Sequence, residues 1–146
     1  MLNLSTKGRY ATRIMVFLAQ RMEGAPARKQ EIAEAEEISI DYVEQILIRL
    51  KIAGLVKSHR GVKGGFTLAG DPNRITVADV LDATEGSTDL VPCLKGHCHR
   101  EPHCVTRPVW QQANAAMIQT FAAHTIGELA RQAIAIERRD SVHYDI

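Results

Sequence analysis

Apolar residues recur at three- and four-residue spacing over the first half of the chain, a pattern typical of amphipathic helices. The first such stripe runs from Tyr10 to Leu18 and stops before Gly24, which supplies a helix end. Residues 28–37 carry a shorter stripe of the same kind. Two helices are therefore predicted before the chain reaches residue 38.

A third helix and a hairpin are predicted next. Ser39 is a good N-cap, and the helix that it begins is predicted to run to about Ala53. Its inward stripe is Val43, Ile46, Leu47 and Leu50. Residues 55–59 and 66–69 predict two short strands around a glycine-rich turn. Three helices followed by a hairpin predict a winged helix-turn-helix.

The second half of the chain predicts three more helices. One covers residues 76–85, a long one begins near residue 106, and the last begins at the capping box of Thr125 and Glu128 and ends near residue 138. The long helix has an apolar side that we expect to serve packing, formed by Trp110, Ala113, Met117 and Phe121. The fold class is thus mainly α with a small β-hairpin wing.

Composition describes an ordinary globular chain. It has 146 residues, of which 24% are charged, and a formal net charge of +1. Lys7, Arg9 and Arg13 precede any long apolar run, so neither a signal peptide nor a membrane helix is predicted. We expect a soluble cytoplasmic protein without a membrane partner.

The distribution of charge is more informative than its sum. No Asp or Glu occurs between Gln45 and Gly70, whereas the preceding helix is rich in Glu. The acid-free segment carries Arg49, Lys51, Lys57, His59, Arg60 and Lys63. Any single one of these would be explained as a solvated surface charge. Together, on the third helix and the hairpin, they predict a double-stranded DNA partner.

Individual side chains suit different parts of the duplex. On the outward face of the third helix, Glu44 could accept from a cytosine amino group and Gln45 could bond adenine. Arg60 at the hairpin tip suits a narrow minor groove. Lys57 and Lys63 are expected at phosphates.

Three cysteines, Cys93, Cys98 and Cys104, fall on one stretch that is interrupted by proline and glycine. An odd number of thiols cannot pair internally, so a disulfide framework is a poor explanation. Thiolates that converge from a flexible loop are the preferred ligands of iron–sulfur clusters and zinc. The loop therefore predicts a metal or cluster site in a reducing compartment.

Other uses of these thiols stay open. Zinc could be held by three Cys and one His as a structural site, and a disulfide or sulfenic acid switch would need no metal. Inert cysteines fit poorly with so polar a loop. A cysteine-dependent enzyme or a ferredoxin-like electron carrier would leave the winged helix unexplained, so we predict that the protein is not an enzyme.

These motifs together resemble the Rrf2 family of bacterial transcription regulators, and the resemblance covers nearly the whole chain. The matching segments are residues 4–11 (LSTKGRYA), 38–39, 42–45 (YVEQ), 54–56, 60–66, the three-cysteine loop, Trp110 and residues 125–129 (TIGEL). The family implies a homodimer in which the long helix over 106–123 crosses its partner and the cysteine loop lies near the interface. It also implies that Glu44 and Gln45 read bases, that Arg60 enters the minor groove, and that Ser39 and Tyr42 position the recognition helix.

The resemblance divides the chain by role. Residues 1–72 would form the DNA-binding region and 73–105 a linking helix with the cysteine loop. Residues 106–138 would form the dimerisation helices, followed by a flexible tail over 139–146. The cluster, 2Fe–2S or 4Fe–4S, would control operator binding in response to iron–sulfur status, redox state or nitric oxide.

Two departures from the family affect the expected cluster site. The first cysteine gap has four residues instead of the more common five. Arg107 stands where one branch of the family has a histidine ligand, and a guanidinium has no free lone pair to donate. Gly8 stands where another branch takes an aspartate from the partner chain. The remaining candidates for a fourth ligand are His97, His99 and His103, or iron with an open position.

Overall fold

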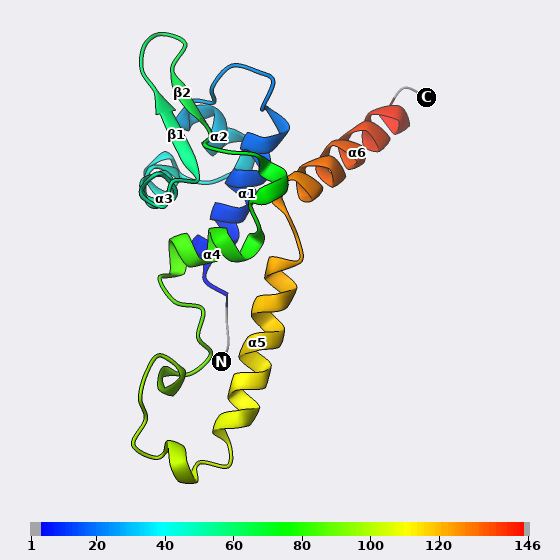
Figure 1. Cartoon of the computed structure of the whole chain (residues 1–146). Helices are drawn as coiled ribbons and strands as arrows, with labels where there is room; N and C mark the ends of the chain where they lie inside the picture. The colour runs from blue at the N-terminus through cyan, green and yellow to red at the C-terminus, as the bar shows by residue number, and fades with distance from the viewer. Residues whose placement is uncertain (1–3, 145–146) are drawn as a thin grey trace.

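The helices and strands follow the order that the apolar pattern predicts. The computed structural model describes residues 4–144 (Figure 1). Its main elements are α1 (Thr6–Gln20), α2 (Lys29–Glu36), α3 (Ile40–Ile52), β1 (Val56–His59), β2 (Gly65–Leu68), α4 (Val77–Glu85), α5 (Arg107–Ala122) and α6 (Ile126–Tyr144). Short 3₁₀ turns occur at η1 (Pro72–Arg74), η2 (Pro92–Leu94) and η3 (Glu101–His103). The order α1, α2, α3 and hairpin is that of a winged helix-turn-helix.

One apolar core holds α3 in place. The predicted stripe Val43, Ile46, Leu47 and Leu50 is at most 1% exposed, so it is confirmed. The stripe packs with buried residues of α1 and α2. The same core also contains Ile75, Val80 of α4 and Ile126 of α6. The first helical turns of α4 and α6 are therefore anchored to the DNA-binding half of the chain.

Local signals at the helix ends explain where α3 and α1 begin. Ser39 caps α3 as predicted, because its side chain accepts from the backbone N–H of Tyr42 at 3.3 Å. Gly54 follows α3 with φ +76°, a conformation that favours glycine. The first helix begins four residues earlier than the stripe from Tyr10 indicates, since Ser5 caps it by accepting from the N–H of Gly8 at 3.0 Å.

The hairpin is a short antiparallel pair with register Val56 to Leu68 and His59 to Gly65. Two contacts tie it to the helices. Lys51 Nζ of α3 donates to Ser58 Oγ at 2.7 Å, and the guanidinium of Arg28 donates to the carbonyl of Val62 at the tip. The wing is thus held beside α3 and the start of α2.

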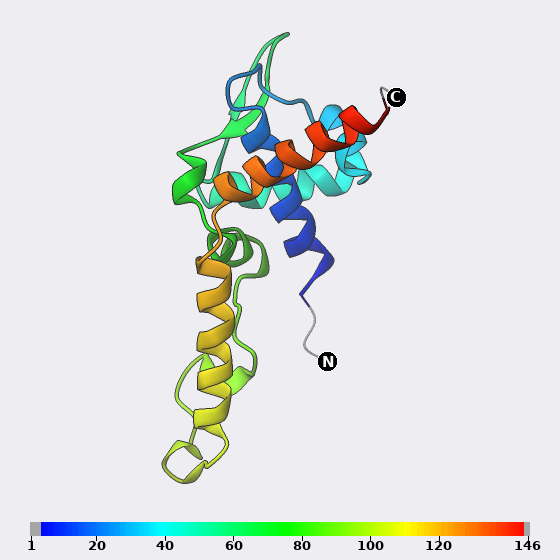
Figure 2. The same ribbon diagram turned by 90° about the vertical axis from the view of Figure 1, so that its right-hand side faces the viewer.

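Helix α5 projects from the core as an arm, with the cysteine loop at its far end and the wing at the opposite end of the molecule (Figures 1 and 2). None of its residues is buried within the described chain, residues 4–144. Met117 and Phe121 are half-buried against α4, in agreement with the predicted packing. Trp110 is 41% exposed, so the other end of the stripe lacks a partner among residues 4–144.

The end of the last helix corrects the prediction. Instead of stopping near residue 138 before a loose tail over 139–146, α6 continues to Tyr144, and residues 145–146 lie outside the described part. Residues 138–140 are Arg, Arg and Asp, which tolerate a helix, and Ser141 Oγ donates back to the Glu137 carbonyl at 2.8 Å. Within residues 4–144 no helix is long and apolar enough to cross a membrane.

Replacing the N-cap of α3 should weaken the fold. We expect Ser39→Ala to lower the free energy of unfolding by about 1 kcal/mol, because the amide of Tyr42 loses its acceptor. Ser39→Asp should keep most of the stability, since Asp caps equally well. Urea denaturation of the three proteins measures this, and equal stability of Ser39→Ala and the parent would show that the cap contributes nothing.

Candidate DNA-binding surface and cysteine loop

The outer face of α3 carries the predicted base readers. Gln45 and Arg49 are exposed, as is Glu44, on the side of the helix that the core leaves free. Glu44 Oε2 pairs with Lys29 Nζ of α2 at 3.1 Å, and the Glu44 side chain is 49% exposed. The pair is open to solvent, so it adds little stability. It places a positive charge beside the one carboxylate that a polyanion would meet on this part of α3.

Ser39 and Tyr42 lie at the start of α3. Tyr42 is half-buried, and its ring meets Tyr10 of α1 edge-on at 5.8 Å between centroids. The guanidinium of Arg13 lies 5.4 Å from the Tyr10 ring, so a cation–π contact supports the same aromatic pair. Tyr42 therefore packs α3 against α1, while the positioning role on DNA that the family resemblance implies for it stays a prediction.

The wing presents its cations to solvent. Lys57, Arg60 and Lys63 are all exposed, and β1 is packed beside α3. Sequence reasoning missed Arg28 and Lys29, which reach the wing tip and Glu44 respectively. Arg28 is the N-cap of α2 and Lys29 is its first residue. Only the folded chain brings this turn next to the acid-free segment. The exposed residues of α3 and the exposed cations of the hairpin thus lie on two elements that pack against each other.

The cysteine loop lies between α4 and α5. Cys93 follows the start of η2, Cys104 follows η3, and all three thiols are free and half-buried. Across residues 4–144, no group of three or more Cys, His, Asp or Glu side chains is gathered closely enough to hold a metal ion. His97, His99 and His103 are exposed, and Nδ1 of His97 lies 3.9 Å from Oε2 of Glu101. In this conformation the predicted ligands share a loop without converging.

Arg107, the first residue of α5, contacts two parts of this loop. Its Nη1 donates to the Cys93 carbonyl at 2.6 Å, and its Nε lies 3.5 Å from Oε1 of Glu101. The side chain is only 12% exposed. Among the described residues, Nε is buried and makes no hydrogen bond. The residue that the sequence indicates only as a non-ligand is therefore a structural contact of the loop, bonded to Cys93 through Nη1 and paired with Glu101 through Nε.

Cys104 is the thiol with a perturbed pKa. Its Sγ lies 3.4 Å from Thr106 Oγ1, and this hydroxyl lowers the pKa of the Cys104 thiol below its ordinary value. The backbone amides of Arg107 and Thr106, at the start of α5, act in the same direction. Hydrogen bonds to sulfur favour the charged form, so this thiol forms a thiolate at lower pH than an ordinary cysteine.

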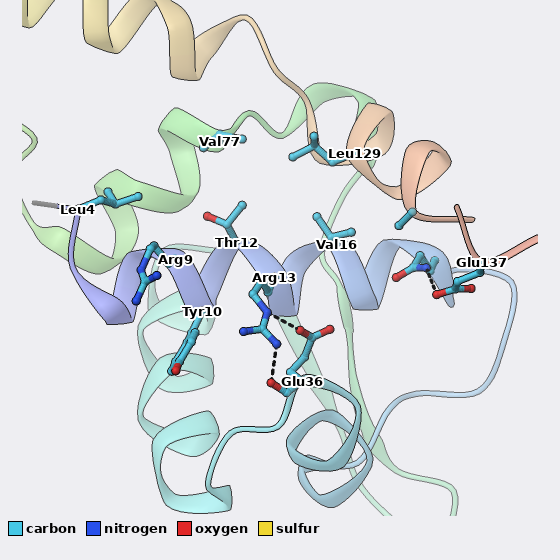
Figure 3. A pocket seen from close by; sticks show the side chains of 12 residues that line it. Leu4, Arg9, Tyr10, Thr12, Arg13, Val16, Glu36, Val77, Leu129 and Glu137 are labelled. Atoms are coloured by element: carbon cyan, nitrogen blue, oxygen red, sulfur yellow. Dashed lines mark hydrogen bonds and ion pairs between the residues drawn. The ribbon is translucent and has the colours of Figure 1, made fainter. Parts of the chain in front are cut away.

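A groove of about 620 Å³ lies along α1, and one of its residues, Tyr10, also contacts Tyr42 of α3 (Figure 3). Its residues are Leu4, Arg9, Tyr10, Thr12, Arg13, Val16, Gln20, Glu36, Val77, Leu129, Ala133 and Glu137. On one side Arg13 Nε pairs with Glu36 Oε2 at 2.8 Å, and Gln20 Nε2 donates to Glu137 Oε1 at 3.0 Å. Because α1, α2, α4 and α6 all contribute, no local sequence pattern indicates it.

A model of the Rrf2 family, described as an iron-dependent transcriptional regulator, matches residues 4–132. The chain belongs to the Rrf2 family. The HTH-type transcriptional regulator IscR of Cronobacter sakazakii is 34% identical over 143 residues, which cover 97% of this chain and 88% of that protein. The expectation that the protein is a transcription regulator and not an enzyme agrees with these relatives.

Solved structures of this family have the same fold. CymR, the global cysteine regulator of Bacillus subtilis, is 33% identical with a TM-score of 0.75, over 90% of this chain and 98% of that one. IscR of T. potens is 33% identical with a TM-score of 0.73, over 90% and 88% of the two chains. The predicted winged helix-turn-helix fold of this Rrf2-family chain is thereby confirmed.

The pKa of Cys104 can be measured directly. In the metal-free Cys93→Ser/Cys98→Ser protein, the pH midpoint of iodoacetamide alkylation should fall below the value of about 8.5 for an ordinary thiol. Thr106→Val should move the midpoint upward, because it removes the hydroxyl beside Sγ, while Thr106→Ser should leave it low. Mass spectrometry across a pH series measures the alkylation rate. A midpoint at or above the ordinary value would contradict the assignment.

Proposed function

We propose that this Rrf2-family protein is a homodimeric DNA-binding regulator whose operator binding is controlled by an iron–sulfur cluster at Cys93, Cys98 and Cys104. The observation that carries this proposal is the position of three free thiols on one loop that leads straight into the exposed helix α5. The description of the family as iron-dependent supports the cofactor. Because the operator is chromosomal DNA, we also propose that the protein acts in the cytoplasm.

The proposed DNA contacts follow the chemistry of each side chain. Glu44 and Gln45 would meet base edges in the major groove, with Arg49 beside them and Ser39 and Tyr42 setting the start of α3. Arg60 at the tip of the wing would enter the minor groove, and Lys57 and Lys63 would neutralise phosphates. Lys29 offsets the charge of Glu44 at 3.1 Å, which reduces its repulsion by the duplex.

A second copy of the chain is the proposed partner of α5. Val109 is 54% exposed, Trp110 41% and Ile118 37%, which leaves apolar side chains on more than one face of α5 in water. Alanines at 113, 115, 116, 122 and 123 would let another helix approach closely. A symmetric pair of α5 helices would bury these faces and set the distance between two α3 helices.

The donor set of the loop fits a thiolate-bound cluster. Three sulfurs are available, and the cations Lys95, Arg100 and Arg107 lie on or beside the same loop, where they would offset the negative charge of a thiolate-bound cluster. The fourth ligand stays a proposal, with His97, His99, His103 or an open iron position as candidates. When bound, the cluster would supply iron that oxygen or nitric oxide can attack.

The loop can act on α5 through Arg107. This residue begins α5 and contacts Cys93 and Glu101 of the loop, so bringing the three thiols together must alter these contacts. A shift at the start of α5 would change how two such helices cross and therefore the separation of the recognition helices. Half-sites lie about 34 Å apart, so a small change in that separation weakens binding.

A thiol switch at the same loop is the second candidate. The lowered pKa of Cys104 favours it, because a thiolate is the form that is oxidised or forms a disulfide. A zinc site with three cysteines and one histidine is the other alternative, and metal analysis distinguishes the two from a cluster.

The wing assignment predicts a loss of affinity. We expect Arg60→Ala to weaken operator binding about tenfold, because a minor-groove arginine is lost, while any cluster is retained. Arg139→Ala is the matched control, since this exposed arginine lies near the end of α6, outside α3, the wing and the cysteine loop. Mobility shifts over a salt series compare the variants. An unchanged affinity for Arg60→Ala would remove the wing from the proposed interface.

Anaerobic purification tests the cofactor. We expect iron and acid-labile sulfide in the parent protein and in Arg60→Ala, and neither in Cys98→Ser. The Cys93→Ser/Cys98→Ser/Cys104→Ser protein should then occupy its operator like the cluster-free form, whatever the redox conditions. Zinc without sulfide would support the zinc alternative. Operator occupancy that is indifferent to all three replacements would end the proposal of control through this loop.

A further inference from the structure

Two isoleucines stand on the outermost face of α3. Ile48 is 53% exposed and Ile52 is 83% exposed. Together with Gln45 they are spaced three and four residues apart, so they share the side of the helix opposite the buried stripe. An exposed isoleucine is ordinary on a surface, but this face is the one that the proposed function turns toward DNA.

The surroundings of Ile48 fit a nucleic acid. It lies four residues after Glu44 and three after Gln45, and it sits inside the acid-free segment next to the exposed Arg49. A polar and cationic surface that carries an exposed apolar side chain matches the major groove, whose base edges offer donors, acceptors and a single apolar group. That group is the 5-methyl of thymine.

We propose that Ile48 contacts a thymine methyl group and so specifies a thymine in each half-site. This inference rests on the proposed docking of α3 in the major groove. Four residues of helix advance about 6 Å, which corresponds to roughly two base-pair steps from the base that Glu44 reads. Ile52 is the last residue of α3 and lies one turn further than Ile48 from the N-terminal end at which recognition helices contact bases, so it is assigned no base.

The test removes the methyl group from the DNA and the isoleucine from the protein separately. The full-length parent protein first selects its preferred duplex from a random-sequence pool. Each thymine of that duplex is then replaced by uracil, which lacks only the methyl group. We expect one thymine per half-site at which this replacement weakens binding about fourfold, the effect of one buried methyl-sized group.

The protein variants decide whether Ile48 is responsible. Ile48→Ala should bind the parent duplex less well by a similar factor and should be insensitive to uracil at that position. Ile48→Val should show a smaller loss and keep part of the sensitivity. Ile52→Ala is the matched control, an exposed isoleucine of the same helix face, and it should respond to uracil like the parent protein.

The outcomes separate this inference from the proposed function. If Ile48→Ala responds to every uracil replacement as the parent does, the thymine assignment is overturned and specific DNA binding stands. If the parent enriches no sequence from the pool, both the assignment and the proposed function are overturned. Thermal unfolding of each variant shows that a loss of binding is not a loss of fold, since both isoleucines are exposed.

Discussion

The burial of one side of α3 determines which of its side chains face solvent and in which direction they point. Val43, Ile46, Leu47 and Leu50 are almost fully buried in a core to which α1, α2, α4 and α6 contribute. Rotating α3 about its axis would expose these apolar side chains to water, and each would lose about 1.5–3 kcal/mol of burial free energy. The opposite side, with Gln45 and Ile48, is therefore presented in a fixed orientation before any DNA arrives.

The same core limits how the cysteine loop can influence α3. Both ends of the segment that carries the loop and α5 are anchored, by Val80 of α4 and Ile126 of α6. Two backbone bonds join these anchors, from Val77 N–H to His124 O at 2.9 Å and from Ile126 N–H to Ile75 O at 2.8 Å. Helix α5 between them is exposed. In the proposed dimer, a change in the loop would thus act on the pairing of the two α5 helices more readily than on the interior of one chain.

Much of the fold could be predicted because its signals are local. The buried stripe of α3, the cap at Ser39 and the glycine turn of the wing are all readable within a few residues. The early start of α1 at Thr6 and the continuation of α6 to Tyr144 were missed, since the cap at Ser5 and a polar stretch outside the apolar stripe form those ends. The contacts of Lys29 with Glu44 and of Arg28 with the wing depend on tertiary packing, which spacing along the chain does not reveal.

The cysteine loop shows where residue types alone are insufficient. Three thiols within a dozen positions indicate ligands, but the sequence assigns Arg107 only a negative role because guanidinium cannot ligate. In the fold this side chain is 12% exposed and bonded to the Cys93 carbonyl, with Glu101 as its one nearby carboxylate. The Glu101 carboxylate lies 3.5 Å from Nε and supplies the counter-charge of the guanidinium. The residue that departs from the family's ligand pattern therefore links both 3₁₀ turns of the loop to the start of α5, a role that only the folded chain reveals.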